Sequence, residues 1–440
     1  MGFSKDFIWG AATASYQIEG AYNEDGKGLN VWDVFNRYPG HIKHFENGDI
    51  ACDHYHRFKE DIKLFKEIGI KCYRFSLSWA RILPDGTGKV NQKGIDFYNN
   101  LIDELLKYNI TPFVTIYHWD LPYALHLQGG WLNPKSADWF EEYTEVVAKN
   151  FGDRVKHFIT FNEPSVFMGC GYWQGSHAPG FRLGDRELLQ VGHNIHLAHG
   201  KAVSVLRKEV SDVKVGITLA TQPKIPVGGA TEQDAYNAYF FSGLGGFFWS
   251  VNYWLDPIVF GEYSKELLEQ AGDLFPKYTA DEMKIISQKI DFMGLNIYEA
   301  QYEGKHVRPQ GEAHTELSWD VYPDALKWGV ILNYKRYNLP IYITENGLST
   351  HDWVSLDGKV HDPNRIDFLH RYLKGLKEGV EAGADVRGYF QWSLMDNFEW
   401  AKGYNPRFGL IHVDYQTQVR TMKDSAYWYK ELIESNGENL

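Results

Sequence analysis

The chain has 440 residues, of which 44% are hydrophobic and 23% are charged. These fractions are ordinary for a globular protein that buries a sizeable core. A formal net charge of −12 excludes nucleic acid and an anionic membrane surface as expected partners, because both are themselves negatively charged.

The amino-terminal segment carries no recognisable targeting signal. Its first ten residues read MGFSKDFIWG and lack a basic start, an apolar core of about 7 residues and a small-residue cleavage site. No apolar run reaches the roughly 18 residues that a membrane-spanning helix needs. We therefore expect a cytoplasmic protein without a signal peptide that acts on a small molecule away from membranes, and we allow for its assembly into a homo-oligomer.

Eight apolar, strand-like runs recur along the chain, and helical patterns lie between them. The runs cover residues 7–14, 71–76, 112–117, 156–161, 214–219, 292–297, 341–344 and 387–392. Apolar residues spaced three and four apart predict helices over residues 55–69, 94–108, 139–151 and 365–379. This alternation, without a linker or a repeat, predicts an α/β fold with one catalytic domain over residues 1–440, a single (β/α)8 TIM barrel.

The chain exceeds the length of a bare barrel, which needs about 250 residues. The surplus lies mainly after the first, fourth and sixth strands, in residues 19–53, 163–186 and 298–322. These segments are predicted to be extended βα loops on the face where barrel active sites form, and they should deepen a pocket there.

Two short strings each place a glutamate just after an apolar, β-branched run. TFNEP at residues 160–164 contains Glu163, and ITENG at residues 343–347 contains Glu345. Because the carboxyl ends of all barrel strands meet at one rim, these two side chains can face each other although they are far apart in sequence. Cleavage of an acetal needs one carboxyl group to protonate the leaving oxygen and another to meet the cationic sugar carbon. A glycosidase is therefore the leading hypothesis.

The surroundings of the two glutamates predict different roles. Glu163 is followed by Pro164 and the apolar run VFMGCGYW, a setting that raises a carboxyl pKa and keeps the proton in place. Arg74 lies on a predicted strand at a matching height and is expected to keep Glu345 ionised. An aromatic content of 16% adds flat rings that stack on the C–H faces of sugars.

The chain resembles the β-glucosidases of glycoside hydrolase family 1 over essentially its whole length. The shared motifs are, in order, FIWGAATASYQIEGA, YRFSLSW, YHWDLP, TFNEP, GLNIY, ITENG, SLMDNFEW and RFGLIHVD. The resemblance implies that Glu163 is the general acid/base and Glu345 the nucleophile of a retaining reaction.

The resemblance also implies roles for the residues around these glutamates. Arg74, Asn296 and Tyr298 would orient Glu345, and Trp392 would form a stacking floor for the terminal sugar. Trp319 resembles the family's platform for the leaving group, although it could instead only anchor its own loop. The remaining expected substrate-binding residues are Gln17, His118, Trp119, Asn162, Glu399, Trp400 and Phe408.

The expected reaction is the release of terminal non-reducing β-D-glucosyl residues from cellobiose, short cello-oligosaccharides and aryl or alkyl β-glucosides. A β-galactosidase or β-fucosidase of the same family stays open as an alternative. The family's 6-phospho-β-glucosidases carry Ser, Lys and Tyr where this chain has Glu399, Pro406 and Phe408, which disfavours a phosphorylated sugar. The presence of both glutamates disfavours a non-enzymatic sugar-binding protein.

Motifs for other chemistries are weak. HNIHLAH at residues 193–199 spaces three histidines so that, at about 100° per residue, the third falls off the helix face of the first. No Walker loop and no GxSxG string occurs in the sequence. We therefore expect neither a metal site nor a cofactor.

Overall fold

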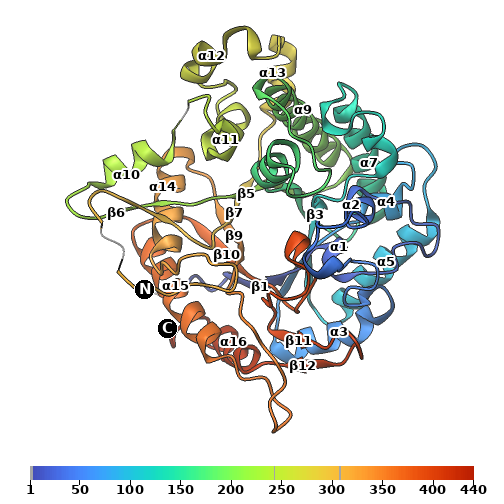
Figure 1. Ribbon diagram of the computed structural model, residues 1–440, viewed down its shortest axis with the longest axis vertical. Coiled ribbons are helices and arrows are strands. Elements are labelled where there is room, and N and C mark those ends of the chain that lie inside the picture. The colour runs from blue at the N-terminus through green and yellow to red at the C-terminus, as the bar shows by residue number, and fades with distance from the viewer. Residues whose placement is uncertain (1–2, 242, 307–308) are drawn as a thin grey trace.

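The computed structural model describes residues 3–241, 243–306 and 309–440. Eight parallel strands close into a barrel in the order β1-β10-β9-β7-β5-β4-β3-β2, and Figure 1 shows helices surrounding them. The predicted TIM barrel and its eight strands are confirmed, with strand ends within two residues of the predicted ones. The barrel strands are β1 (Ile8–Ala12), β2 (Cys72–Ser76), β3 (Thr111–Tyr117), β4 (His157–Asn162), β5 (Lys214–Ala220), β7 (Phe292–Asn296), β9 (Ile341–Asn346) and β10 (Val386–Trp392).

Long amphipathic helices connect the strands and bury one face against them. The four predicted helices correspond to α3, α5, α7 and α15. Helix α3 ends where Gly69 adopts a left-handed conformation with φ 86°, which glycine reaches without a steric penalty. The outer helices are α3 (His54–Ile68), α5 (Gln92–Lys107), α7 (Ser136–Phe151), α9 (Asp185–Glu209), α13 (Ala280–Ile286), α14 (Ala325–Tyr337), α15 (Pro363–Glu381) and α16 (Asp424–Glu434).

Aromatic side chains fill the barrel interior. The ring of Phe113 on β3 lies 5.5 Å from Phe292, 5.5 Å from Tyr342 and 5.1 Å from Phe390. All three pairs are steeply inclined, with interplanar angles of 64–67°, in the edge-to-face class of arrangement that aromatic rings favour. This packed layer, which also contacts Trp392 and Phe408, gives the carboxyl-terminal face of the barrel a rigid support.

The surplus residues lie after more strands than predicted. The long segments after β1, β4 and β7 are confirmed, but two further extensions follow β5 and β10. The first holds β6 (Lys224–Pro226), α10 (Glu232–Tyr239), α11 (Val251–Val259) and α12 (Lys265–Ala271), and the second holds β11 (Ile411–Val413) and β12 (Arg420–Met422). Their helical and apolar patterns look like those of ordinary barrel elements, so the sequence does not single them out.

The extensions are built from short elements that pair with one another. Strand β6 pairs in parallel with β8 (Gln301–Glu303), and β11 pairs antiparallel with β12. The remaining short elements are α1 (Ser15–Ile18), α2 (Val31–Phe35), η1 (Lys43–Phe45), α4 (Trp79–Ile82), α6 (Tyr123–His126), η2 (Gly130–Leu132), α8 (Pro164–Met168), η3 (Gly169–Gln174), η4 (Phe247–Trp249), η5 (Gly272–Leu274) and η6 (Trp400–Lys402).

Candidate active site

Glu163 and Glu345 lie at the carboxyl ends of their strands, as predicted. Glu163 directly follows β4 and adopts a left-handed backbone conformation with φ 48° and ψ 63°. Its backbone N–H still donates to the carbonyl of Thr218 on β5 over 2.8 Å. Glu345 belongs to β9 and pairs in register with Asn296 on β7. Both glutamates line one cavity of about 770 Å³ at this end of the barrel.

Left-handed backbone recurs around this cavity. Besides Glu163, the non-glycine residues Trp119 and Trp400 have φ values of 76° and 47°. Such a conformation costs about 1–2 kcal/mol per residue because Cβ approaches the carbonyl oxygen. Strained residues of this kind concentrate where surrounding contacts hold a functional side chain in place. The concentration of three of them here supports the assignment of this cavity as the site.

Two donors hold the carboxylate of Glu345. Nη1 of Arg74 donates to Oε1 over 2.6 Å, and the hydroxyl of Tyr298 donates to Oε2 over 2.7 Å. The pKa of Glu345 lies above its ordinary value because burial, the largest influence, outweighs the opposing effects of the Arg74 charge and of the hydrogen bonds from Arg74 and Tyr298. The ion pair and the two oriented donors favour the ionised form of this carboxyl, as the sequence predicted for Arg74.

Glu163 has a different environment. It accepts one hydrogen bond, from Nδ2 of Asn296 over 2.8 Å. Burial and the negative charge of Glu345 raise the pKa of Glu163 to about 8, and the Asn296 hydrogen bond opposes them only in part. Among the described residues, Glu345 has a cationic partner and Glu163 has none, so Glu163 is the member of the pair that keeps its proton at neutral pH.

Asn162 and His118 form a connected polar wall. Oδ1 of Asn162 accepts from Nη2 of Arg74 over 2.6 Å and from Nδ2 of Asn296 over 3.1 Å, which fixes the orientation of the amide. Nδ2 of Asn162 then donates to Nε2 of His118 over 3.0 Å. Burial lowers the pKa of His118, so the neutral ring carries its proton on Nδ1. That buried atom has no partner within the described residues and can donate to a sugar hydroxyl.

Glu399, a further carboxyl group of the cavity, lies on the loop after β10. Its Oε2 accepts from Nε2 of Gln17 over 3.4 Å, while the same Gln17 nitrogen donates to the carbonyl of Phe398 over 2.9 Å. Burial and the charge of Glu345 raise the pKa of Glu399 to about 8, against the hydrogen bond from Gln17. This pKa was not foreseen from the sequence, because it depends on how deeply the fold buries Glu399 and on how closely it brings Glu399 to Glu345.

Indole rings make the apolar walls. Trp400 stacks on Tyr16 with ring centroids 6.1 Å apart and an interplanar angle of 7°, and lies 4.6 Å from Trp119. Across the cavity, Trp319 lies 5.2 Å from Tyr298 and 6.2 Å from Phe408. Trp319 also lines the cavity, and its role as a platform for the leaving group stays a prediction.

The structure brings the predicted site residues together, but at different depths. Those that line the cavity are His118, Trp119, Glu163, Asn296, Tyr298, Trp319, Glu345, Trp392, Glu399, Trp400 and Phe408. Gln17, Arg74 and Asn162 lie directly behind this lining, where they hydrogen-bond Glu399, Glu345 and His118, respectively. Direct sugar contacts from Gln17 and Asn162 stay a prediction.

Several lining residues were missed by the sequence analysis. They come mainly from the segments after β4, β5 and β7, and they form the outer part of the cavity: His177, Gln222, Lys224, Phe241, Trp249, Glu299, Gln301 and Lys402. No motif marks them, because they come from separate segments that meet only on folding; β6–β8 pairing, for example, places Lys224 beside Gln301. The outer wall thus combines aromatic rings with amide and charged groups.

The three histidines of HNIHLAH lie on α9 and are packed into the protein. Nδ1 of His193 lies 2.9 Å from the hydroxyl of Tyr263, and Nδ1 of His199 lies 2.8 Å from Oγ1 of Thr160. His196 contacts the carbonyl of Trp254 through Nε2 at 3.3 Å. Within the described residues, no group of three or more His, Cys, Asp or Glu side chains is arranged to hold a metal ion, and no helix there has the length and apolarity to cross a membrane.

Comparisons with known proteins agree with the geometry of the site. Residues 1–438 match the model of the family described as Glycosyl hydrolase family 1. A 1,4-beta-D-glucan glucohydrolase of Thermotoga neapolitana is 47% identical over an alignment that covers 99% of both chains, and beta-glucosidase A of Acetivibrio thermocellus is 44% identical, with 99% of both chains covered. The structure of the Thermotoga maritima beta-glucosidase in complex with glucoimidazole superposes with a TM-score of 0.92 at 45% identity, again over 99% of both chains. The chain therefore belongs to glycosyl hydrolase family 1 and is a glycoside hydrolase.

Proposed function

We propose that the protein is a retaining β-glucosidase that releases terminal β-D-glucosyl residues, with Glu163 as general acid/base and Glu345 as nucleophile. The observation that carries the proposal is the unequal support of two neighbouring buried carboxyl groups. Glu345 is held by Arg74 and Tyr298 at 2.6 and 2.7 Å, whereas Glu163 has the single amide contact to Asn296 at 2.8 Å. One carboxyl group suited to be ionised beside one suited to be protonated is what glycoside cleavage requires.

In the first step, Glu345 attacks the anomeric carbon while Glu163 gives its proton to the departing oxygen. The attack forms a covalent bond between a Glu345 oxygen and the sugar, and the aglycone leaves as a neutral alcohol. Arg74 and Tyr298 keep the nucleophilic oxygens pointed into the cavity, so that little motion is needed on the way to the transition state.

In the second step, Glu163 removes a proton from water, and the resulting hydroxide displaces Glu345 from the sugar. Esterification makes Glu345 neutral during this step, and the charge that raised the pKa of Glu163 is then gone. The pKa of Glu163 therefore falls when the residue has to act as a base. Two inversions at the same carbon leave the product with the β configuration of the substrate.

The proposed substrates are cellobiose, short cello-oligosaccharides and aryl or alkyl β-glucosides. A cavity of about 770 Å³ exceeds what one terminal sugar occupies, and its outer aromatic and amide groups suit a second sugar or an aromatic leaving group. The relatives include a 1,4-beta-D-glucan glucohydrolase, which supports glucan fragments. A Thermotoga maritima relative is also known in complex with galacto-hydroximolactam, which keeps β-galactosides open as a second substrate class.

The test is a panel of p-nitrophenyl β-D-glycosides together with cellobiose. We expect turnover of the glucoside to exceed that of the galactoside and fucoside, and NMR of the first product to show β-glucose before it mutarotates. The appearance of α-glucose first would contradict the double displacement. Lack of turnover on every substrate of the panel would contradict the proposed function.

A further inference from the structure

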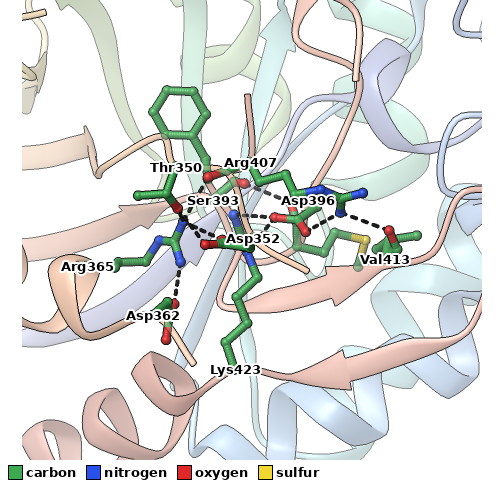
Figure 2. Close-up of polar contacts among 12 residues, drawn as sticks. Thr350, Asp352, Asp362, Arg365, Ser393, Asp396, Arg407, Val413 and Lys423 are labelled. Atoms are coloured by element: carbon green, nitrogen blue, oxygen red, sulfur yellow. Dashed lines mark hydrogen bonds and ion pairs between the residues drawn. The ribbon is translucent and has the colours of Figure 1, made fainter. Parts of the chain in front are cut away.

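Six charged side chains form a buried cluster where the loops after β9 and β10 meet (Figure 2). Three are acids and three are bases, so the charges balance, and none of them lines the cavity described above. The members of this charge cluster are Asp352, Asp362, Arg365, Asp396, Arg407 and Lys423.

Lys423 lies at the junction of the cluster. Its ammonium group is 2.5 Å from Oδ2 of Asp352 and 2.7 Å from Oδ1 of Asp396, and the side chains of Lys423 and Asp396 are both 0% exposed. Asp352 belongs to the loop that leaves β9, the strand of Glu345, and Asp396 belongs to the loop that leaves β10. One ammonium group thus joins two loops that approach the active site from neighbouring strands.

Asp396 closes the base of the β10 loop. Its Oδ1 accepts from the backbone N–H of Gly409 over 2.9 Å, and its Oδ2 accepts from Nη1 of Arg407 over 2.6 Å. The residues between these two ends include Glu399 and Phe408, which line the cavity. The carboxylate of Asp396 therefore fixes both ends of the segment that presents them.

Arg365 ties the same loop to the end of β9. Its Nη2 donates to Oδ2 of Asp352 and to the carbonyl of Arg407, each over 2.8 Å, and to Oγ1 of Thr350 over 2.6 Å. The backbones of Thr350 and Arg407 also exchange hydrogen bonds of 3.0 and 3.1 Å. Thr350 follows Glu345 by only five residues, so this contact places Phe408 relative to the proposed nucleophile.

Stability alone does not account for a fully buried lysine between two aspartates. Desolvation of three charges offsets much of their attraction, and well-packed apolar residues often stabilise a fold equally well. What a charge cluster provides and an apolar one does not is direction, because each hydrogen bond fixes both a distance and an angle. The cluster directs two loops toward one pocket.

We propose that Lys423 is a positioning residue for the reaction. It holds the β9 and β10 loops together and thereby fixes the positions of Glu399 and Phe408 relative to Glu345. The inference rests on the proposed function, because it assumes that the sugar binds between these residues. Because the family's 6-phospho-β-glucosidases differ from this chain at Glu399, Pro406 and Phe408, we place the 6-position of the sugar beside Glu399 and Phe408. The benefit of the 6-hydroxyl group to catalysis should therefore depend on Lys423.

The test compares p-nitrophenyl β-D-glucoside with its 6-deoxy analogue in wild type, Lys423→Met, Lys423→Arg and the charge-balanced pair Lys423→Met with Asp352→Asn. In Lys423→Met we expect kcat/KM for the glucoside to fall by about tenfold or more, since small misplacements near a reacting group are costly. The 6-deoxy substrate should lose much less, so the ratio of the two kcat/KM values should shrink. Lys423→Arg should restore part of the ratio, whereas the charge-balanced pair should recover melting temperature and not the ratio.

Arg336→Met is the matched control. Arg336 on α14 donates to both carboxylate oxygens of the largely buried Asp256 on α11, at 3.0 and 2.5 Å, and neither residue lines the cavity. This variant should lower the melting temperature and leave the substrate ratio unchanged.

If the ratio of kcat/KM values for the glucoside and its 6-deoxy analogue is unchanged in both Lys423→Met and the charge-balanced pair, the inference is overturned. Failure of both variants to fold would also overturn it, because the cluster would then serve folding alone. A wild-type protein without turnover would instead refute the proposed function. If the wild type is active and the ratio of its kcat/KM values on the two substrates does not change in these variants, only the role of Lys423 is refuted.

Discussion

Arg74 reaches across the barrel from β2 to Glu345 on β9, and its Nη1 lies 2.6 Å from Oε1 of the glutamate. The two strands are separated by β1 and β10 in the barrel order, so the contact spans the interior and both side chains are almost fully buried. The same guanidinium group donates to Oδ1 of Asn162 over 2.6 Å, next to Glu163 in sequence. A single cation thus holds the proposed nucleophile while it also supports the strand end that carries the acid.

Removal of the Glu345 side chain should abolish hydrolysis without unfolding the protein. Glu345→Gly deletes the nucleophile at the rim of the cavity and leaves the barrel core intact. Added azide should then enter the vacated space and restore turnover of a 2,4-dinitrophenyl glucoside, because a small anion can attack the anomeric carbon directly. A single inversion gives the α-glycosyl azide, which NMR distinguishes from the β form.

Glu345→Gln is the matched control for this rescue. The amide removes the charge but keeps the volume, so azide finds no space and should not restore turnover. Wild-type activity in Glu345→Gly, or a β-glycosyl azide as its product, would show that Glu345 is not the nucleophile.

Loss of Glu163 should affect substrates according to their leaving groups. Glu163→Ala removes the proton donor and keeps Glu345 with its partners Arg74 and Tyr298. Cellobiose has a strongly basic leaving alkoxide and should lose about 10²–10⁴-fold in kcat/KM, the usual contribution of a general acid. A 2,4-dinitrophenyl glucoside needs no proton and should lose far less, and azide should trap its glycosyl-enzyme as the β-glycosyl azide. Equal losses on both substrates would assign Glu163 another role.

The pKa of Glu163 should depend on the charge of Glu345. Burial and that charge raise the pKa of Glu163 to about 8, so the protonated, active form persists at neutral pH and kcat/KM should fall as the pH rises through this region. Glu345→Gln removes the neighbouring negative charge, which makes ionisation easier and lowers the pKa of Glu163. Carboxyl titration by ¹³C NMR of wild type and variant measures the difference.

Glu399→Gln serves as the comparison for this titration. The charge of Glu399 contributes less to the raised pKa of Glu163 than that of Glu345 does, so the pKa should fall less in Glu399→Gln than in Glu345→Gln. Identical pKa values in wild type and Glu345→Gln would contradict the coupling on which the two-step role of Glu163 depends.

The sequence predicts the barrel and the two glutamates well because short stretches of neighbouring residues indicate both. Each barrel strand is a short apolar run, and Glu163 and Glu345 follow two of these runs directly. The outer cavity has no such signature, since Trp249 and Gln301 come from different βα extensions and meet only after folding. The same holds for the charge cluster. Asp352 and Lys423 lie outside every motif quoted above, and SLMDNFEW, which contains Asp396, does not indicate the partners of that aspartate, so the cluster forms a recognisable unit only after folding.

The last prediction concerns discrimination between a free and a phosphorylated sugar. Phe408 offers no hydroxyl group to a 6-phosphate, Pro406 offers no cation, and Glu399 presents a carboxyl group. Two unit charges about 4 Å apart at an effective dielectric constant of about 20 repel by about 4 kcal/mol, or nearly three powers of ten in binding. The pKa of Glu399 near 8 leaves this carboxyl mostly neutral at pH 7, so the full repulsion acts only at higher pH. The missing hydroxyl and cation at Phe408 and Pro406 then account for most of the preference at pH 7, and we expect about 100-fold in favour of p-nitrophenyl β-D-glucoside over its 6-phosphate.

The pH dependence of this preference gives the sharper test. The ratio of the two kcat/KM values cancels the titration of Glu163 and Glu345, which both substrates share. A sugar phosphate is already close to dianionic above pH 7, so between pH 7 and 9 the main change is ionisation of Glu399, and the preference for the free sugar should widen. Glu399→Ser should remove this pH dependence. It should also narrow the preference, because it weakens binding of the free sugar and removes the repulsion of the phosphate. Lys402→Ala measures how much the lysine that lines the same cavity contributes to binding of the phosphate. A ratio that stays flat from pH 7 to 9 in the wild type, or equal kcat/KM on both substrates, would show that Glu399 does not face the 6-position of the sugar.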